Sequence, residues 1–247
     1  MTTTSESMMT NSSESMTNSN QSIVFTLSSS LSSMTETASP FNFTGVFANI
    51  KDLTGNFTAM SLQYSTTSTN ASQNANGSAS YFVVGHPTMN GTVLTEVNIT
   101  ITGSSSSGTT NTSALVWFDS LGNVTQAVIS GQTISGAQAS FAGFLIYPFV
   151  IFFSYQNSFL GNATVFQYFH NAGTATETIG SVSMPVTTYQ ASNVVEGNAT
   201  VQSATIRIGQ IPGTNLHLTV EIDGQGYSTK NTGTESFMFK VLNLTKA

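Results

Sequence analysis

Thirteen of the 21 asparagines in this chain stand in Asn-X-Ser/Thr triplets, the pattern that is modified by N-linked glycans at the asparagine amide. Ser and Thr make up 74 of the 247 residues, so chance alone predicts about six such triplets. The excess predicts a glycosylated, extracellular surface. The predicted sites are Asn42, Asn56, Asn70, Asn76, Asn90, Asn98, Asn111, Asn123, Asn162 and Asn198; the remaining triplets begin at Asn11, Asn20 and Asn243.

Asn243 is a special case among these triplets. It shares strand parity with Phe237, Phe239 and Val241, so a regular strand would point it toward the core. We therefore expect that the strand ends before Asn243, that it bulges there, or that the site stays unmodified.

The residues that commonly carry catalysis do not form a recognisable motif. His86, His170 and His217 lack metal-ligand spacing, and Asp119 and Asp223 stand in turn sequences, where Asp is favoured for its local hydrogen bonds. The chain contains no Gly-rich phosphate loop and no Gly-X-Ser-X-Gly elbow. The sequence predicts a protein that is not an enzyme and that uses no metal and no cofactor.

The composition excludes several partners. Charged residues make up only 6% of the chain, against roughly 25% in an ordinary domain, and five Lys and Arg residues cannot form a surface for nucleic acid. No cysteine is present for a disulfide framework. Residues 1–20 contain no apolar segment typical of a signal peptide, and the longest apolar run has ten residues, too few to span a bilayer. We interpret the sequence as a mature chain without a membrane span.

The N-terminal segment, residues 1–40, is a Ser/Thr-rich tail with one periodic stretch. Residues 22–31 read QSIVFTLSSSL with the preceding Gln, and their apolar positions alternate with polar ones, as in a strand with one apolar face. Burying each apolar side chain of this segment stabilises by about 1.5–3 kcal/mol, so we expect the strand to pair with a sheet of its own chain or of another chain. The predicted donor row consists of Ile23, Phe25, Leu27 and Leu31.

The remaining residues, 41–247, read as an all-β head. Short strands separated by turn sequences predict a β-sandwich of pilin-like or Ig-like type. The clearest strand is 215–222, in which apolar and polar residues alternate strictly. Residues 65–80 and 103–113, rich in Ser, Thr, Asn and Gly, are predicted to be long glycan-bearing loops, and 42–50 and 140–154 are predicted to be strands.

The apolar run at 144–153 allows three interpretations. It is a buried core strand broken by a bulge at Pro148, the floor of a groove that accepts a strand from another molecule, or the wall of a lipid-binding cavity. The residues of the possible acceptor groove are Phe144, Ile146, Phe149, Ile151 and Phe153.

With its tail, single strand and glycan-rich head without cysteine, the chain resembles the thread filament subunits of Sulfolobus-type archaea. The resemblance implies an extracellular, N-glycosylated surface filament that polymerises head to tail, each copy donating strand 22–31 to the next. The partners would then be other copies of the chain and its N-linked glycans. Two alternatives remain: a monomeric cell-surface or virion-associated glycoprotein whose strand completes its own head, and a lipid-binding β-barrel.

Overall fold

The computed structural model of the protein describes residues 45–69, 74–146, 149, 168–196, 199–228 and 231–247. The first half contains β1 (Val46–Phe47), α1 (Ile50–Asn56), β2 (Phe57–Ser68), β3 (Ala75–Gly85), β4 (Thr88–Met89), β5 (Thr92–Val93), β6 (Thr95–Ser105), β7 (Gly108–Phe118), β8 (Val124–Ile129), β9 (Gln132–Ser135) and the 3₁₀ helix η2 (Gly136–Leu145). The second half contains β10 (His170–Ile179), β11 (Val182–Glu196), β12 (Ala199–Gln210), β13 (Leu216–Ser228) and β14 (Asn231–Lys246).

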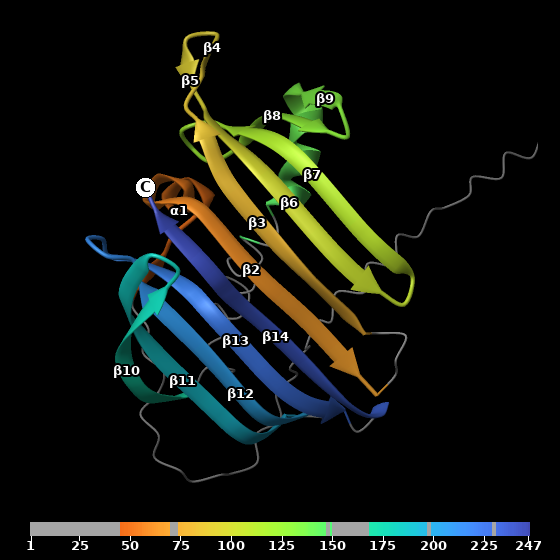
Figure 1. The fold of residues 1–247 in the computed structure, drawn as a ribbon. Coiled ribbons are helices and arrows are strands. Elements are labelled where there is room, and N and C mark those ends of the chain that lie inside the picture. The colour runs from red at the N-terminus through yellow and green to blue at the C-terminus, as the bar shows by residue number, and fades with distance from the viewer. Residues whose placement is uncertain (1–44, 70–73, 147–148, 150–167, 197–198, 229–230) are drawn as a thin grey trace, which may run out of the picture.

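The prediction of an all-β fold is confirmed, but the described strands do not divide into the two sheets of a sandwich. Apart from the small β4–β5 hairpin, they form one sheet of 12 strands in the order β10-β11-β12-β13-β14-β2-β3-β6-β7-β8-β9, with β1 alongside β13. Each half of the chain is an antiparallel meander, and the two meanders join where β14 pairs with β2 (Figure 1). This long ladder makes the two meanders one continuous sheet, with β9 at one edge and β10 at the other.

One face of the β2–β9 half carries the core and is called the core face here. Met60, Tyr81, Ile99 and Ala114 are cross-strand partners on β2, β3, β6 and β7, and all four are buried. The 3₁₀ helix η2 belongs to the same core through Ala142 and Leu145, and further along Ile146 and Phe149 are buried with them. The ring of Phe149 meets that of Tyr81 edge-on, with centroids 5.2 Å apart.

Hydroxyl groups cover much of the opposite side, called the outer face here. Ser61, Ser80, Thr100 and Ser113 are cross-strand partners in a row across β2, β3, β6 and β7. In the next row the hydroxyls of Ser78 and Thr102 lie 2.7 Å apart and hydrogen bond to each other. The alternation of apolar and hydroxyl-bearing residues therefore explains how a chain with so few charges keeps one sheet face polar.

Two predicted strands are helical in part. Within the predicted strand 42–50, β1 at Val46–Phe47 is extended, but α1 begins at Ile50 behind an N-terminal capping box in which Asn49 and Asp52 bond each other's backbone amides at 3.0 and 2.9 Å. Residues 140–154 were also expected to be a strand, but the part up to Leu145 belongs to η2. Both segments are apolar enough to be buried, and burial alone does not distinguish a strand from a helix.

Two predicted loops are mostly strands. The end of β2 and the start of β3 take up most of residues 65–80, and β6 and β7 continue to a two-residue turn at Ser106 and Ser107. The tip of the β6–β7 hairpin is exposed on both faces, so its sequence shows no apolar alternation. Backbone pairing holds it instead, because β6 also pairs with β3 as far as Ser105.

Candidate functional site

The edge strand β10 is the most accessible long element of the sheet. It has ten residues, eight of them exposed, and among the described residues it pairs only with β11. A register shift between Asn171 and Gly173 marks a bulge near its start. Beyond that bulge the ladder with β11 is regular as far as the turn, so a regular stretch of edge remains.

The backbone groups that β10 leaves unpaired toward the outside can be assigned from the register. A two-residue turn headed by Gly180, with φ 61°, joins Ile179 to its partner Val182, and such a turn closes with a hydrogen bond between these flanking residues. Bonded and non-bonded pairs then alternate along the ladder. Thr176 falls in a non-bonded pair, as its partner Pro185 requires because proline has no N–H.

The same alternation places Thr174 and Thr178 in non-bonded pairs. The hydroxyls of Thr174 and its partner Thr187 lie 2.9 Å apart, which agrees with the closer side-chain approach in pairs of this kind. The N–H and C=O groups of three threonines therefore point away from β11, toward a further strand position: Thr174, Thr176 and Thr178.

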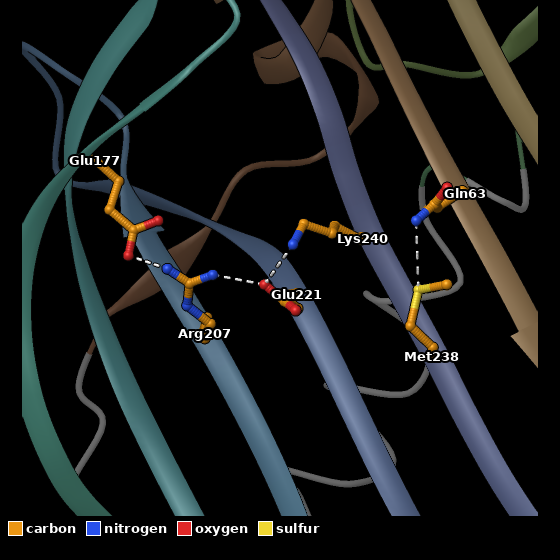
Figure 2. A network of polar contacts seen from close by, with 6 residues as sticks. All are labelled: Gln63, Glu177, Arg207, Glu221, Met238 and Lys240. Carbon is orange, nitrogen blue, oxygen red and sulfur yellow. Dashed lines mark hydrogen bonds and ion pairs between the residues drawn. The ribbon is translucent and has the colours of Figure 1, made fainter.

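A network of charged side chains ties β10 to the sheet. Arg207 of β12, the only arginine of the chain, pairs with Glu177 of β10 and, at 2.5 Å, with Glu221 of β13. Lys240 of β14 lies 3.4 Å from the same Glu221 carboxylate (Figure 2). The side chains of Arg207, Glu177 and Glu221 are only 23%, 29% and 18% exposed, so these pairs are shielded from water more than surface pairs are.

Sequence reasoning missed this network. Glu221 stands at a polar position of the predicted strand 215–222. Glu177 and Glu221 are 44 residues apart along the chain, as their numbers show, and only the cross-strand register brings both to one arginine. One signal was available in the sequence. In a chain with few charges, Arg207, Glu221 and Lys240 each stand between two apolar residues of a strand, where charged residues on neighbouring strands can pair.

The described strand sequons share the outer face. Asn111 is the cross-strand partner of Thr102, Asn98 is that of Phe82, and Asn76 has the parity of Ser78 on β3. At Asn243 the strand bulges, which was one of the expected outcomes, because the register of β14 on β2 shifts between Val241 and Asn243. The bulge leaves Asn243 exposed and opposite Ser61 of the outer face, while Leu244 is buried.

Three further sequons lie outside the long strands. Asn90, with φ 50°, is in the β4–β5 turn, Asn56 ends α1, and Asn123 follows the β7–β8 turn. Asp119 organises that last turn by accepting the backbone N–H groups of Leu121 and Asn123 at 2.8 Å each. The Asn123 side-chain amide also donates to Asp119 at 3.1 Å, and these bonds hold the pKa of Asp119 below its usual value. The predicted sites Asn42, Asn70, Asn162 and Asn198 lie outside the described residues.

The predicted donor row and acceptor groove are described only in part. Ile23, Phe25, Leu27 and Leu31 lie outside the described residues, as do Ile151 and Phe153 and the side chain of Phe144. Ile146 and Phe149 are 8% and 2% exposed within the chain's own core. They are therefore already packed by their own chain, and the open edge of β10 is the more accessible place for a strand from outside.

The described residues contain no group of three or more His, Asp and Glu side chains arranged to hold a metal ion. Within the same residues no helix is both long and apolar enough to cross a membrane.

The comparisons with known proteins assign no family. No family model matches the chain, and no curated protein matches it. The chain is distantly similar to three solved structures, each at 10% identity. A DUF1329 family protein from Desulfovibrio piger has a TM-score of 0.25 over 76% of this chain and 84% of that chain. A β-barrel-like DUF1849 protein from Brucella abortus has a TM-score of 0.22 over 78% of this chain and 99% of that chain. MucB in complex with MucA(peri) has a TM-score of 0.13 over 77% of this chain and 90% of that chain. These TM-scores are too low to carry an argument about function.

Proposed function

We propose that the protein is the non-enzymatic structural subunit of an extracellular, N-glycosylated surface filament, in which strand 22–31 of one copy adds to the edge of β10 in the next. The observation that carries this proposal is the long open edge of β10. It is ten residues long, the same length as segment 22–31, and it turns the backbone groups of Thr174, Thr176 and Thr178 outward.

The edge has little of the usual protection against strand addition. Proteins commonly guard an exposed edge with lysines, prolines, inward-pointing charges or very short strands. In β10 the bulge at Gly173 is confined to one end, and no lysine or proline is present. The one charged side chain, Glu177, lies on the face of buried Met184, and its ion pair with Arg207 of β12 offsets the protection that an unpaired inward-pointing charge would give. An edge left open in this way favours β-augmentation.

The distribution of sequons supports the same edge. Neither β10 nor β11 contains an Asn-X-Ser/Thr triplet, although they contain Asn171 and Asn193. On the other half of the sheet, β3, β6 and β7 each carry one on the outer face. Glycans would thus cover the sheet face and keep copies apart there, while the β10 edge stays free for the next copy.

The apolar row of the donor fits beside β10. Ala175 and Ile179 are the cross-strand partners of Val186 and Val182, which are buried in the main core together with Met184. A strand added outside β10 can place Leu27 and Leu31, which are four positions apart, next to Ala175 and Ile179, with Ser29 next to Glu177, and so extend that core. Since each copy gives one strand and accepts one, the contact does not close and a filament grows.

Proline substitution at the edge tests this proposal. Thr176→Pro removes an outward N–H without removing a bond to β11, so it should block strand addition and leave the head folded. Thr133→Pro is the matched control on the other edge. Residues 129 and 132 flank a two-residue turn, so Thr133 of β9 also has its N–H directed outward.

Electron microscopy and size-exclusion chromatography of full-length glycosylated protein measure the result, and circular dichroism measures folding. We expect filaments for the wild type and Thr133→Pro, and folded monomers for Thr176→Pro. Filaments that persist in Thr176→Pro would contradict addition at β10. A wild type that is monomeric at all concentrations would instead support the second candidate, a monomeric glycoprotein whose strand 22–31 occupies the same edge in cis.

A further inference from the structure

We infer that the glycan on Asn98 is a structural part of the outer face, with its first sugar rings packed on Phe82 and Leu115. The inference rests on the glycosylation in the proposed function and is independent of polymerisation. It assigns one site at which a glycan contributes to folding stability, in contrast to sites at which glycans only cover the surface.

Asn98 lies between two apolar side chains. On β6 it is the Cα partner of Phe82 on β3 and also of Leu115 on β7. Residues directly opposite each other in an antiparallel pair share a face, with Cβ atoms about 4.5–5.5 Å apart. A group attached to the Asn98 amide therefore starts between the phenyl ring on one side and the leucine on the other.

The apolar surface around Asn98 is partly uncovered. The described residues leave Phe82 52% exposed and Val84, two positions further along β3, 47% exposed. Elsewhere the same face carries rows of Ser and Thr, as at Ser80 and Thr100. An exposed phenyl ring on a sheet with few charges is a site for unwanted association unless something covers it.

A sugar ring is suited to this position. One face of a pyranose consists of C–H groups, which pack against the negative face of an aromatic ring, while its hydroxyls remain in water. Covalent attachment to Asn98 keeps the sugar beside Phe82, so the contact does not lose the translational freedom that a free ligand would lose. The sequon at Asn98 thus attaches the glycan between Phe82 and Leu115, the apolar side chains on which it would pack.

Asn76 provides the contrast within the same face. On β3 it is the Cα partner of Ser65 on β2 and of Ser104 on β6, so hydroxyl-bearing residues lie on both sides. A glycan there has no apolar side chain directly across the strand on which to pack. Removing it should therefore leave stability nearly unchanged.

The test uses full-length protein from a host that glycosylates it, with occupancy of both asparagines measured by site-resolved mass spectrometry. Asn98→Gln and Asn76→Gln are each made in the wild type and in Phe82→Thr, a change that suits a strand. We expect Asn98→Gln to lower the Tm by about 2–4 °C, which is the shift that a loss of about 1 kcal/mol causes in a chain of this length. We also expect it to raise the binding of a hydrophobic dye. Asn76→Gln should change neither.

In the Phe82→Thr background Asn98→Gln should have little further effect, because the surface for the sugar is gone. Leu115→Thr serves the same purpose if Phe82→Thr does not fold. Equal Tm shifts for Asn98→Gln and Asn76→Gln, or an unchanged Asn98→Gln effect without Phe82, would overturn the inference while glycosylation itself stands. An unmodified Asn98 in a protein modified elsewhere would also overturn it, as would a dimer joined through Phe82.

Discussion

The two edges of the sheet end in different ways. β9 has only four residues, Gln132–Ser135, and the chain passes directly from it into η2, which packs on β8 and β9. β10 has ten residues, of which eight are exposed, and among the described residues nothing pairs with its outer side. A very short edge strand is a common protection against association, and a long open one is the opposite.

The difference shows that edge protection in this protein is selective. The chain keeps its surface almost free of charge, so it cannot guard every edge with lysines. At β9 it shortens the strand. At β10 one of the few acids of the chain, Glu177, forms an ion pair with Arg207 of β12, and this pair holds the open edge strand against the sheet. An edge that is stabilised and yet left open is suited to receiving a partner strand.

The largest effect is expected from the strand that we propose β10 receives. Phe25→Asp or Leu27→Asp should abolish polymerisation and leave the head folded, because an unpaired carboxylate on the apolar side of a donor strand costs several kcal/mol. The monomer fraction by size-exclusion chromatography, together with circular dichroism of the head, measures this outcome.

Substitutions of the opposite parity are the control. Thr26→Asp and Ser28→Asp place the same charge on the polar side of segment 22–31, where it should have much less effect. Equal loss of polymer at odd and even positions would show that this segment is not a donor strand with one buried face.

The turns of the two edge hairpins give the second comparison. Gly180 heads the β10–β11 turn with φ 61°, and a Cβ there would lie 2.7 Å from the backbone N of Leu244 on β14. Gly131 in the β8–β9 turn has φ 79°, but a Cβ there would meet nothing within 4 Å. We expect Gly180→Ala to cost about 2–4 kcal/mol and Gly131→Ala about 1 kcal/mol, the difference being the backbone clash.

Urea unfolding of the monomeric head measures both values. Equal losses would show that the left-handed backbone alone determines the cost, and that the packing of the β10–β11 turn against β14 is not tight. The comparison therefore reports on how firmly the open edge is attached, independently of any filament.

The sequence predicted strands best where apolar and polar residues alternate. The segment 215–222 was correctly predicted to be a strand because Leu218 and Val220 alternate with polar residues, although a bulge in its pairing with β12 breaks the face pattern and Thr219 is buried as well. The β6–β7 hairpin tip was mistaken for a loop because both of its faces meet solvent and only backbone bonding to β3 defines it. Ile50 and Leu145 were read as strand residues because a short apolar segment has no period long enough to distinguish helix from strand.

The candidate site was less accessible to sequence reasoning. Sequons are local patterns, so Asn76, Asn98 and Asn111 could be found directly, and parity predicted the conflict at Asn243 that the bulge resolves. The open edge of β10 could not be predicted, because which strand ends a sheet depends on the order in which two meanders join. The Glu177–Arg207–Glu221 contacts likewise depend on register between distant segments.

The smallest of these effects concerns how β10 is held. Arg207→Gln leaves the carboxylates of Glu177 and Glu221 near each other without their shared cation, and the half-shielded position makes the expected loss about 2 kcal/mol, below that of a fully buried pair. Urea unfolding measures the loss. Hydrogen exchange should quicken at the β10 amides bonded to β11, such as Ala175, and stay unchanged in β9.

Lys240→Gln is the matched control for Arg207→Gln. Its ammonium lies 3.4 Å from Glu221, its side chain is 44% exposed, and it does not reach β10, so we expect a loss of less than about 1 kcal/mol and no change in exchange at β10. If Arg207→Gln speeds exchange at β9 as much as at β10, the network stabilises the sheet as a whole. Faster exchange confined to β10 would mean that the only arginine of the chain serves to hold the open edge in place, because an edge strand that frays cannot present three outward amides in register to a partner.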